Sequence, residues 1–385
     1  AIVRVSRTGS STQVSINAVP GADARLEAPS TREVLRMYPG LEAFLPLLTR
    51  DEDLEQWRVT AAAASPGRSE VWLGTYGNGV LRVDPTFNRA DGVPFGLVES
   101  GVGALAPAAD GIWVGGLGRP GARGALVFAS NDLQRWRWLD GPRSRPFAGA
   151  RVNAMAVRGH TAWIGTSRGL LRMDVEDDAR VSMWNATQGM PSDVVTSVVA
   201  RGDSACVGTS AGLAHVGETV RTIGPRVQIH GLTSWGDTLW IASSVGVLVL
   251  TPGDSMPRTL ELDESRLRRP IVAVARDDSI VIAVTGDAEL VEIDVRAKRV
   301  LSPRAAAVSS LREIARIAVD ARTLWLAGEG GVLVIDRSTG RSTFLAAGSA
   351  LPAPATDVII TREVAWVGTR DGLVQIRRRA DGMPP

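Results

Sequence analysis

The sequence is poor in the residues that build disulfides and metal sites. One cysteine, Cys206, occurs in 385 residues, so no disulfide can form within the chain and no cysteine cluster can hold a metal. The three histidines, at positions 160, 215 and 230, show neither HxH nor HExxH spacing, and no motif links them to a nucleophilic serine. The sequence therefore supports neither a metal site nor Ser-His-Asp catalysis.

Long apolar segments and lysines are also missing. The longest apolar runs, such as residues 194–200 and 280–284, fall far short of the roughly 20 residues that cross a bilayer, so no transmembrane segment is expected. Lys298 is the only lysine, and we interpret the excess of arginine as the codon bias of a GC-rich genome. The net charge of +2 gives no support to nonspecific nucleic-acid binding, which needs a concentrated basic face.

One phrase is repeated eight times along the chain. It is clearest as AWVGTRDGLVQI at residues 365–376, and its copies are separated by 41, 50, 43, 34, 43, 42 and 41 residues. Two degraded copies have Cys206 and Ala283 at the key position. The other six have tryptophan there: Trp72, Trp113, Trp163, Trp240, Trp325 and Trp366. A fixed period of about forty residues is typical of a propeller, a solenoid or an array.

The pattern inside each copy selects among these architectures. Each copy has a short β-rich run, a turn with glycine and a second β-rich run, which predicts a hairpin. The segments between copies leave room for two further strands, such as residues 181–184 and 194–199. Four strands in about forty residues form a propeller blade. We therefore predict an all-β fold, a single β-propeller of eight four-stranded blades, with seven blades as the alternative if a degraded copy fails to form one.

The repeated tryptophans are interpreted as structural residues. Tryptophan is large enough to fill the wedge between adjacent blades, and burying it contributes a few kcal/mol at roughly 25 cal/mol per Å². The Gly-Thr pair that follows ends the strand with a residue without Cβ and a residue that can hydrogen-bond the turn. The next glycine, such as Gly169, supports a positive φ as the chain reverses.

The two ends of the chain depart from the repeat. Residues 1–56 carry no copy and are predicted to form an N-terminal extension, with the propeller at residues 57–385. Capping-box spacing at residues 30–33 predicts short helices over residues 31–49, which either plug the ring or dock a partner. The last copy lacks an outer strand, so residues 2–6 or 13–16 are expected to pair there. A chain that starts at Ala1 without Met is consistent with export after signal-peptide cleavage, which predicts a periplasmic or extracellular location.

The longest spacing contains the candidate partner-binding segment. Residues 118–151 hold seven arginines against Asp132 and Asp140, interleaved with aromatic residues. Arginine and tryptophan are enriched at interface hot spots, and insertions into a rigid scaffold often carry binding. The alternative is a solvated loop. The candidate residues are Arg119, Arg123, Arg135, Trp136, Arg137, Trp138, Arg143 and Arg145.

The run W-[IVL]-G-T-x-x-G-L, seen at residues 163–170 and 366–373, resembles the propeller repeat of bacterial two-component regulators. The phrase GMPSDVVTSV at residues 189–198 resembles the linker of the same family. The resemblance implies an extracytoplasmic propeller that senses ligands, often glycans, or contacts proteins. This chain departs from those sensors because it has no transmembrane, kinase or DNA-binding part.

A second resemblance concerns cofactors. Residues 334–341 contain DRSTG, which is similar to a turn of the eight-bladed quinoprotein propellers, but only one copy fits. No quinone or other cofactor is therefore expected. The function predicted from the sequence is a non-enzymatic, exported bacterial scaffold that binds a protein partner as an accessory subunit of an envelope or membrane complex. The alternative is a glycan or small-ligand sensor, and an enzyme is third.

Overall fold

A computed structural model describes residues 2–8, 11–17, 59–64, 70–75, 80–84, 89–93, 96–118, 126–139, 149–176, 181–262, 264–301 and 308–385. The chain divides into two compact units, Ala1–Val93 and Pro94–Pro385. The sequence analysis placed the boundary at residue 57, so the first motif copy was assigned to the propeller. In the structure this copy, with Trp72, belongs to the first unit. The helices predicted at residues 31–49 lie outside the described residues.

The first unit contains a hairpin and one blade-like sheet. The hairpin pairs β1 (Ile2–Thr8) with β2 (Ser11–Asn17). The sheet has the order β3 (Val59–Ala64), β4 (Val71–Thr75), β5 (Val80–Asp84) and β6 (Arg89–Val93). The segments that were expected to complete the last blade are therefore paired with each other in this structure.

The second unit contains seven antiparallel sheets. Each has its strands in chain order from the inside of the ring outwards, and the last sheet has three strands where the others have four. The strands are β7 (Val102–Pro107), β8 (Gly111–Gly116), β9 (Leu126–Ser130) and β10 (Trp136–Leu139); β11 (Val152–Arg158), β12 (Thr161–Thr166), β13 (Gly169–Asp174) and β14 (Val181–Trp184); β15 (Val195–Arg201), β16 (Ser204–Thr209), β17 (Gly212–Val216) and β18 (Val220–Ile223); β19 (Ile229–Trp235), β20 (Thr238–Ser243), β21 (Gly246–Leu250) and β22 (Arg258–Thr259); β23 (Ile271–Asp277), β24 (Ile280–Thr285), β25 (Leu290–Asp294) and β26 (Arg299–Val300); β27 (Ile314–Val319), β28 (Thr323–Gly328), β29 (Gly331–Asp336) and β30 (Ser342–Ala346); and β31 (Ala355–Ile360), β32 (Val364–Thr369) and β33 (Gly372–Arg377).

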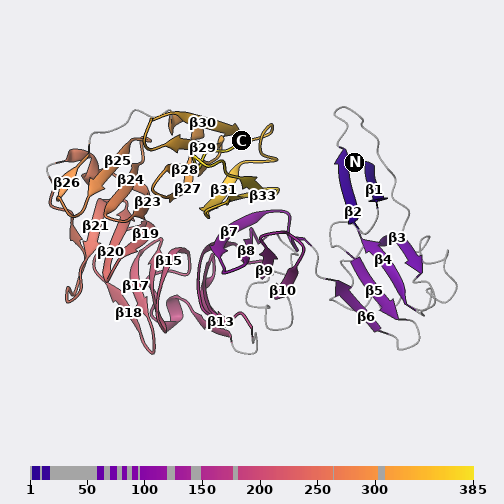
Figure 1. Cartoon of the computed structure of the whole chain (residues 1–385). Coiled ribbons are helices and arrows are strands. Elements are labelled where there is room, and N and C mark those ends of the chain that lie inside the picture. Colours follow the sequence, from indigo (N-terminus) through magenta and orange to yellow (C-terminus); the bar gives the residue numbers. More distant parts are fainter. Residues whose placement is uncertain are drawn as a thin grey trace. The chain divides into compact units, whose positions relative to one another are not determined.

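These seven sheets close a ring by themselves (Figure 1). Each innermost strand packs beside the innermost strand of the next sheet, and β31 of the last sheet packs beside β7 of the first. The predicted all-β propeller is confirmed, and the repeat does give eight blade-like sheets. Seven of them form the ring, which is the number that the sequence analysis left as its alternative. The excluded copy is the one at Trp72 and not a degraded one.

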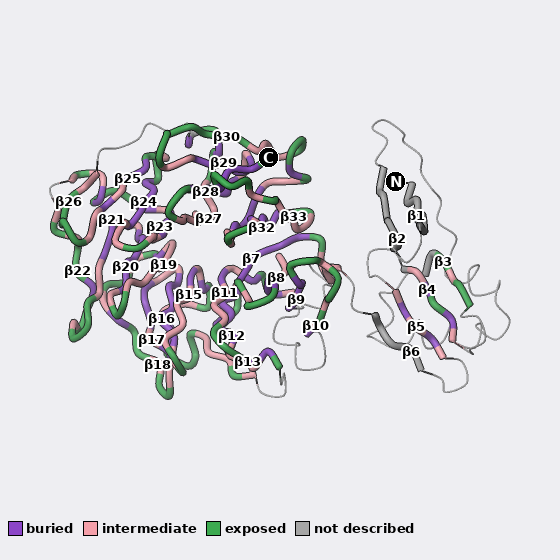
Figure 2. Tube along the Cα trace, in the orientation of Figure 1, coloured by how far each residue is buried: buried purple, intermediate pink, exposed green. Residues whose placement is uncertain are grey.

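The motif tryptophans of the ring are buried between blades, as expected. Trp113, Trp163, Trp240, Trp325 and Trp366 are at most 3% exposed, and in Figure 2 the strands of the ring hold most of the buried segments. A residue from the connection that leads to the next blade covers most of them. Met190 is buried in the cluster of Trp163, Leu267 in that of Trp240 and Leu351 in that of Trp325, and Leu97 packs in the cluster of Trp366.

Trp72 shows what the motif looks like without such a neighbour. Its side chain is 37% exposed, although Val71 and Leu73 on either side of it are buried. The described part of the first unit holds a single blade-like sheet, so this unit supplies no second blade to cover the tryptophan. The apolar connection that follows this copy contributes Leu97 to the cluster of Trp366 instead.

The Gly-Thr-x-x-Gly part of the motif works as the sequence suggested. The Thr166 hydroxyl donates to the carbonyl of Gly169 over 2.8 Å and accepts from the backbone N–H of Arg168 over 3.0 Å, which closes the hairpin turn. Gly169 has a φ of 136°, where a side chain would be strained. A Cβ on Gly165 would lie 2.3 Å from a methyl group of Val195 in the next blade, so this glycine permits the close approach of two blades.

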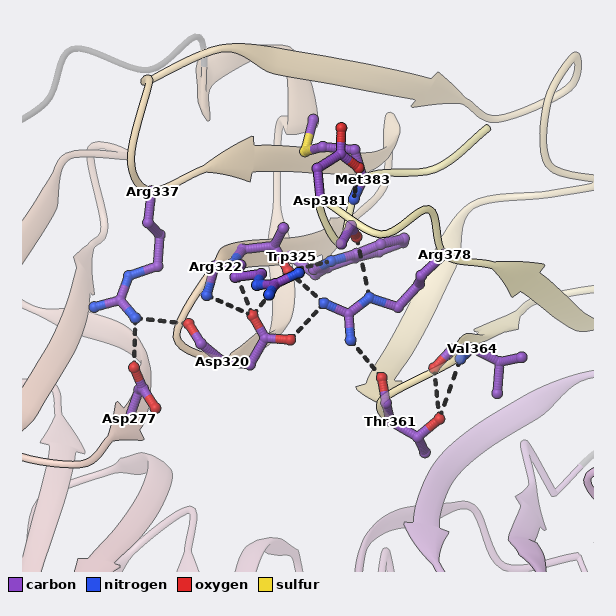
Figure 3. A network of polar contacts seen from close by, with 12 residues as sticks. Asp277, Asp320, Arg322, Trp325, Arg337, Thr361, Val364, Arg378, Asp381 and Met383 are labelled. Carbon is purple, nitrogen blue, oxygen red and sulfur yellow. Dashed lines mark hydrogen bonds and ion pairs between the residues drawn. The ribbon is translucent and has the colours of Figure 1, made fainter.

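The end of the chain locks the last blade onto the preceding one (Figure 3). The side chain of Arg378 is 3% exposed and forms an ion pair with Asp320, in the turn between β27 and β28. It also donates to the hydroxyl of Thr323 over 2.9 Å and to the carbonyl of Gly382 over 3.0 Å. Met383 is buried in the cluster of Trp325. This part of the tail therefore belongs to the core.

We expect the two classes of motif tryptophan to differ sharply in their effect on stability. Trp366→Ala should lower the free energy of unfolding by about 3–5 kcal/mol, because it opens a cavity between two blades. Trp72→Ala should cost about 1 kcal/mol or less, because its side chain is already partly in water. Urea unfolding followed by far-UV circular dichroism measures both. Equal losses in the two variants would contradict the seven-bladed ring.

Two adjacent arginines provide a test of the C-terminal lock. Arg378→Gln leaves Asp320 without its buried cation, which should cost about 3 kcal/mol of unfolding free energy. Arg377 is exposed on the outermost strand of the last blade, and Arg377→Gln should change the stability by less than about 0.5 kcal/mol. Thermal and urea unfolding of the two single variants would show the difference. A stable Arg378→Gln protein would mean that the tail does not hold the ring.

Candidate functional site

A β-bulge recurs at the same place in the innermost strand of every blade. In each one the register with the second strand shifts by one residue, for example between Val152 and Ala154 and between Ile314 and Arg316. Bulges redirect side chains and are common at rims and binding sites. The seven bulged residues all line one cavity on the axis of the ring: Gly103, Asn153, Thr196, His230, Val272, Ala315 and Thr356.

Three of these bulged residues connect their blade to the next one. The Asn153 amide donates to the carbonyl of Val195 over 2.8 Å, and the Thr196 hydroxyl donates to the carbonyl of Ile229 over 2.6 Å. Thr356 makes the equivalent bond of 2.7 Å to Val102, across the seam where the last blade meets the first. The bulges thus build the rim of the cavity and join the blades around it.

The position after the bulge carries the most informative difference between blades. Five blades have a small residue there, and the remaining two, which are adjacent, have Arg316 and Asp357. The small residues leave the axis open, and the half-buried Arg316 extends across it. Its guanidinium donates to the carbonyl oxygens of Asn153 and Thr196, in the two blades opposite its own. The five small residues are Ala104, Ala154, Ser197, Gly231 and Ala273.

Asp357 is buried beside Arg316, but the two side chains form no ion pair. One carboxylate oxygen of Asp357 accepts the backbone N–H of Leu105 over 2.7 Å, which adds a second bond across the seam. The other accepts the N–H of Val358 over 2.8 Å. Burial raises the pKa of Asp357, and the charge of Arg316 and these two hydrogen bonds only partly oppose it.

The mouth of the cavity is basic. The cavity has a volume of about 560 Å³ and is lined by Arg151, Arg312 and Arg316, with Glu313 as the acidic residue beside them. Among the described residues, no carboxylate forms an ion pair with any of the three arginines. Partial burial, followed by the charges of Arg316 and Arg370, lowers the pKa of Arg151. Burial also lowers the pKa of His230, which favours its neutral form. Such a cavity is suited to holding an anion.

The described part of the sequence-predicted segment is engaged within its own blade. Arg135 forms an ion pair of 2.6 Å with Asp110, and the guanidinium of Arg137 lies 5.1 Å from the ring centre of Trp113. The indole N–H groups of Trp136 and Trp138 donate over 2.9 Å to the carbonyls of Leu133 and Gly96, and both rings pack in the cluster of Trp366. Arg119, Arg123, Arg143 and Arg145 lie outside the described residues.

The ends of that segment nevertheless meet at the cavity. A Cβ on Gly118 would lie 2.4 Å from the backbone nitrogen of Arg151, so the two ends of the insertion are adjacent. Gly118 is held by a hydrogen bond of 3.0 Å from its N–H to the carboxylate of Glu99. Because Arg151 lines the cavity, the insertion begins and ends at the basic mouth.

Sequence reasoning missed Arg151 as a member of this mouth, and missed Arg316 and Asp357 altogether. The signal that could have found the last two is an alignment of the innermost strands with one another. In the five other blades of the ring the same position has alanine, serine or glycine. A charged residue at a position that is otherwise small marks a departure from the structural repeat.

The described residues contain no group of three or more His, Cys, Asp or Glu side chains that could hold a metal ion. No helix among them is both long and apolar enough to span a membrane.

Two carboxylates with opposite pKa shifts predict opposite pH effects. Burial raises the pKa of Asp357 above 3.8, so the folded state favours the protonated carboxyl. The free energy of unfolding of the wild type, relative to that of Asp357→Asn, should therefore fall as the pH rises from 3.8 to the raised pKa. Above the raised pKa it should fall no further. Hydrogen bonds from Arg266 lower the pKa of Glu264 from 4.5 to about 2, so wild-type stability relative to Glu264→Gln should rise between those values. Urea unfolding between pH 2 and 8 measures both differences. Parallel curves for wild type and Asp357→Asn would contradict the first assignment.

Comparisons with known proteins support the fold. No family model matches the sequence, and no curated protein is similar to it. Solved structures match at low sequence identity. YCF48 bound to D1 peptide has a TM-score of 0.54 and 13% identity over 74% of this chain and 94% of the other. A chain of the Mitotic Checkpoint Complex has a TM-score of 0.55 and 12% identity over 72% of this chain and 86% of the other.

PorZ, a bacterial surface component of the type-IX secretion system of Porphyromonas gingivalis, has a TM-score of 0.54 and 12% identity. The match covers 74% of this chain and 37% of PorZ, so this chain corresponds to a minor part of that protein's length. At such identities these likenesses concern the fold alone. Together with the closed ring of blade-like sheets, they establish that the second unit is a β-propeller.

Proposed function

We propose that the chain is a non-enzymatic binding module that recognises an acidic segment of a partner protein at the cavity-bearing face of its propeller. The observation that carries the proposal is the group of three arginines, Arg151, Arg312 and Arg316, around one cavity with no ion-paired carboxylate among the described residues. Arginine pairs bidentately with carboxylates, so this mouth complements an acidic surface.

The arginines of the insertion are proposed to extend the same surface. The described ends of the insertion lie at the mouth, and Arg119, Arg123, Arg143 and Arg145 belong to the two segments that leave and return there. The neighbouring Trp136 and Trp138 are then best assigned to holding the outer strand in place, because their rings and N–H groups are already used inside the blade. A rigid ring would present these charges at low entropic cost.

The biological setting is proposed from weaker support. The repeat resembles that of two-component-regulator propellers, which favours a bacterial, exported protein. The related folds include one bound to a peptide, one in a checkpoint complex and one bacterial surface component of a secretion system. An accessory subunit of an envelope or membrane complex is consistent with all of these.

The second candidate is a sensor that binds a glycan or another small neutral ligand in the cavity. The observation that favours it is the polar lining, which includes Asn153, Thr196, Thr285 and Thr356. However, the hydroxyls of Thr196 and Thr356 already donate to neighbouring blades, which leaves Arg151 and Arg312 as the main donors whose side chains make no hydrogen bond within the described residues. We therefore rank the acidic partner first.

The proposal predicts charge-dependent peptide binding. A fluorescein-labelled hexaglutamate peptide should bind the full chain at 50 mM NaCl and much more weakly at 300 mM, because screening reduces exposed charge pairs, and hexaglutamine should not bind. Arg151→Ser/Arg312→Ser should weaken binding about tenfold or more, as expected for lost charge-assisted hydrogen bonds. Fluorescence anisotropy gives the Kd in each case.

A matched control removes the same charge from elsewhere on the ring. Arg221 and Arg299 are exposed on the outermost strands β18 and β26, and Arg221→Ser/Arg299→Ser should bind hexaglutamate nearly as well as wild type. If both double variants bind hexaglutamate equally weakly, the loss of affinity follows from net charge alone. The cavity-bearing face would then have no support as the binding site. Tight binding of hexaglutamine would favour a ligand class other than an acidic segment.

A further inference from the structure

Arg316 holds a positive charge inside the propeller and, among the described residues, forms no ion pair. It donates to three backbone carbonyls, those of Ala315, Asn153 and Thr196, which are neutral acceptors. The nearest inner-strand acid, Asp357, uses its two oxygens on backbone N–H groups. A guanidinium in such surroundings keeps its charge, because arginine does not deprotonate in proteins.

Arg151 brings a second positive charge to the same cavity. It immediately precedes β11, the strand whose Asn153 carbonyl accepts from Arg316, and it lines the same cavity as Arg316. Burial, followed by the charge of Arg316, lowers the pKa of Arg151. Two like charges at one cavity are stabilised when an anion lies between them.

We propose that Arg151 and Arg316 hold a single carboxylate group in the cavity on the axis of the ring. The Arg151 guanidinium makes no hydrogen bond within the described residues, so its planar N–H donors can match the two oxygens of a carboxylate, while Arg316, whose N–H groups are partly used on carbonyls, adds its charge. Glu313 lines the same mouth and disfavours more highly charged groups such as phosphate. A cavity of about 560 Å³ admits one side chain or a small carboxylic acid. The inference deepens the proposed function, on which it rests for the identity of the partner, and it names the group that enters the cavity.

Small molecules test this site without any partner protein. Sodium glutarate replaces NaCl at constant ionic strength in this experiment. At a concentration about tenfold above its Kd, it should raise the Tm of the full chain by about 3 °C. Glutaramide, which has the same length without charge, should give no shift. Arg151→Gln should lose more than half of the glutarate shift and should fold, because the Arg151 side chain makes no hydrogen bond or ion pair within the part of the chain that the structure describes.

Arg221→Gln is the matched control, because Arg221 is exposed on the outermost strand β18 and does not line the cavity. It should keep most of the shift. Arg316→Gln should abolish it, although this variant also loses bonds to two blades, so the conclusion depends on Arg151→Gln. Equal losses in Arg151→Gln and Arg221→Gln, equal shifts from glutarate and glutaramide, or no shift from either would overturn the proposal.

The two proposals fail in different ways. If hexaglutamate binds wild type but Arg151→Gln leaves both its affinity and the glutarate shift unchanged, the acidic partner stands and the two-arginine site is wrong. If glutarate shifts the Tm and hexaglutamate does not bind, the carboxylate site stands and the partner is not an acidic segment. If sodium phosphate raises the Tm as much as glutarate does at the same ionic strength, the choice of a carboxylate is also contradicted.

Discussion

The covering of each motif tryptophan by the following blade is the interaction on which the propeller depends. A blade is a small sheet with two apolar faces, and neither can be buried within the blade itself. Each tryptophan buries its ring only when the connection to the next blade brings an apolar residue over it, as Leu267 does for Trp240. Closure therefore requires that the last tryptophan, Trp366, be covered by a residue at the start of the ring. Leu97 is that residue.

The assignment of Leu97 decides the number of blades. An eight-bladed ring would need this connection to cover Trp72, the tryptophan of the copy that immediately precedes it in the chain. In the structure the connection packs in the cluster of Trp366, and β31 packs beside β7. Thr356 donates a hydrogen bond across the seam, and Asp357 accepts one. Trp72 is left partly exposed in a separate unit. The choice is thus made at one seam, by contacts between residues more than 250 positions apart.

Much of this fold could be predicted from the sequence because the repeat is local and periodic. The spacing of the tryptophans gives the blades, and the Gly-Thr-x-x-Gly phrase gives the turns, since both depend on residues within one hairpin. The count of seven could not be predicted, because all eight copies carry the same local pattern and only long-range packing separates them. The contacts that Trp136 and Trp138 make within the ring could not be predicted for a related reason. Composition marks them as interface residues, but their partners are in the same blade or its seam.

The candidate site follows from the size of the ring. The innermost strands of seven blades stand close enough around the axis for one arginine side chain to reach the carbonyls of the two opposite blades. Adding a blade would widen the axis and separate Arg316 from those carbonyls, so the guanidinium would be either solvated or paired elsewhere. The same bulge that turns Asn153 and Thr196 towards the axis also points their side chains at the next blade. Closure of the ring and the placement of the basic cavity therefore have one cause, and a sequence change that altered the number of blades would remove the carboxylate site together with the seam.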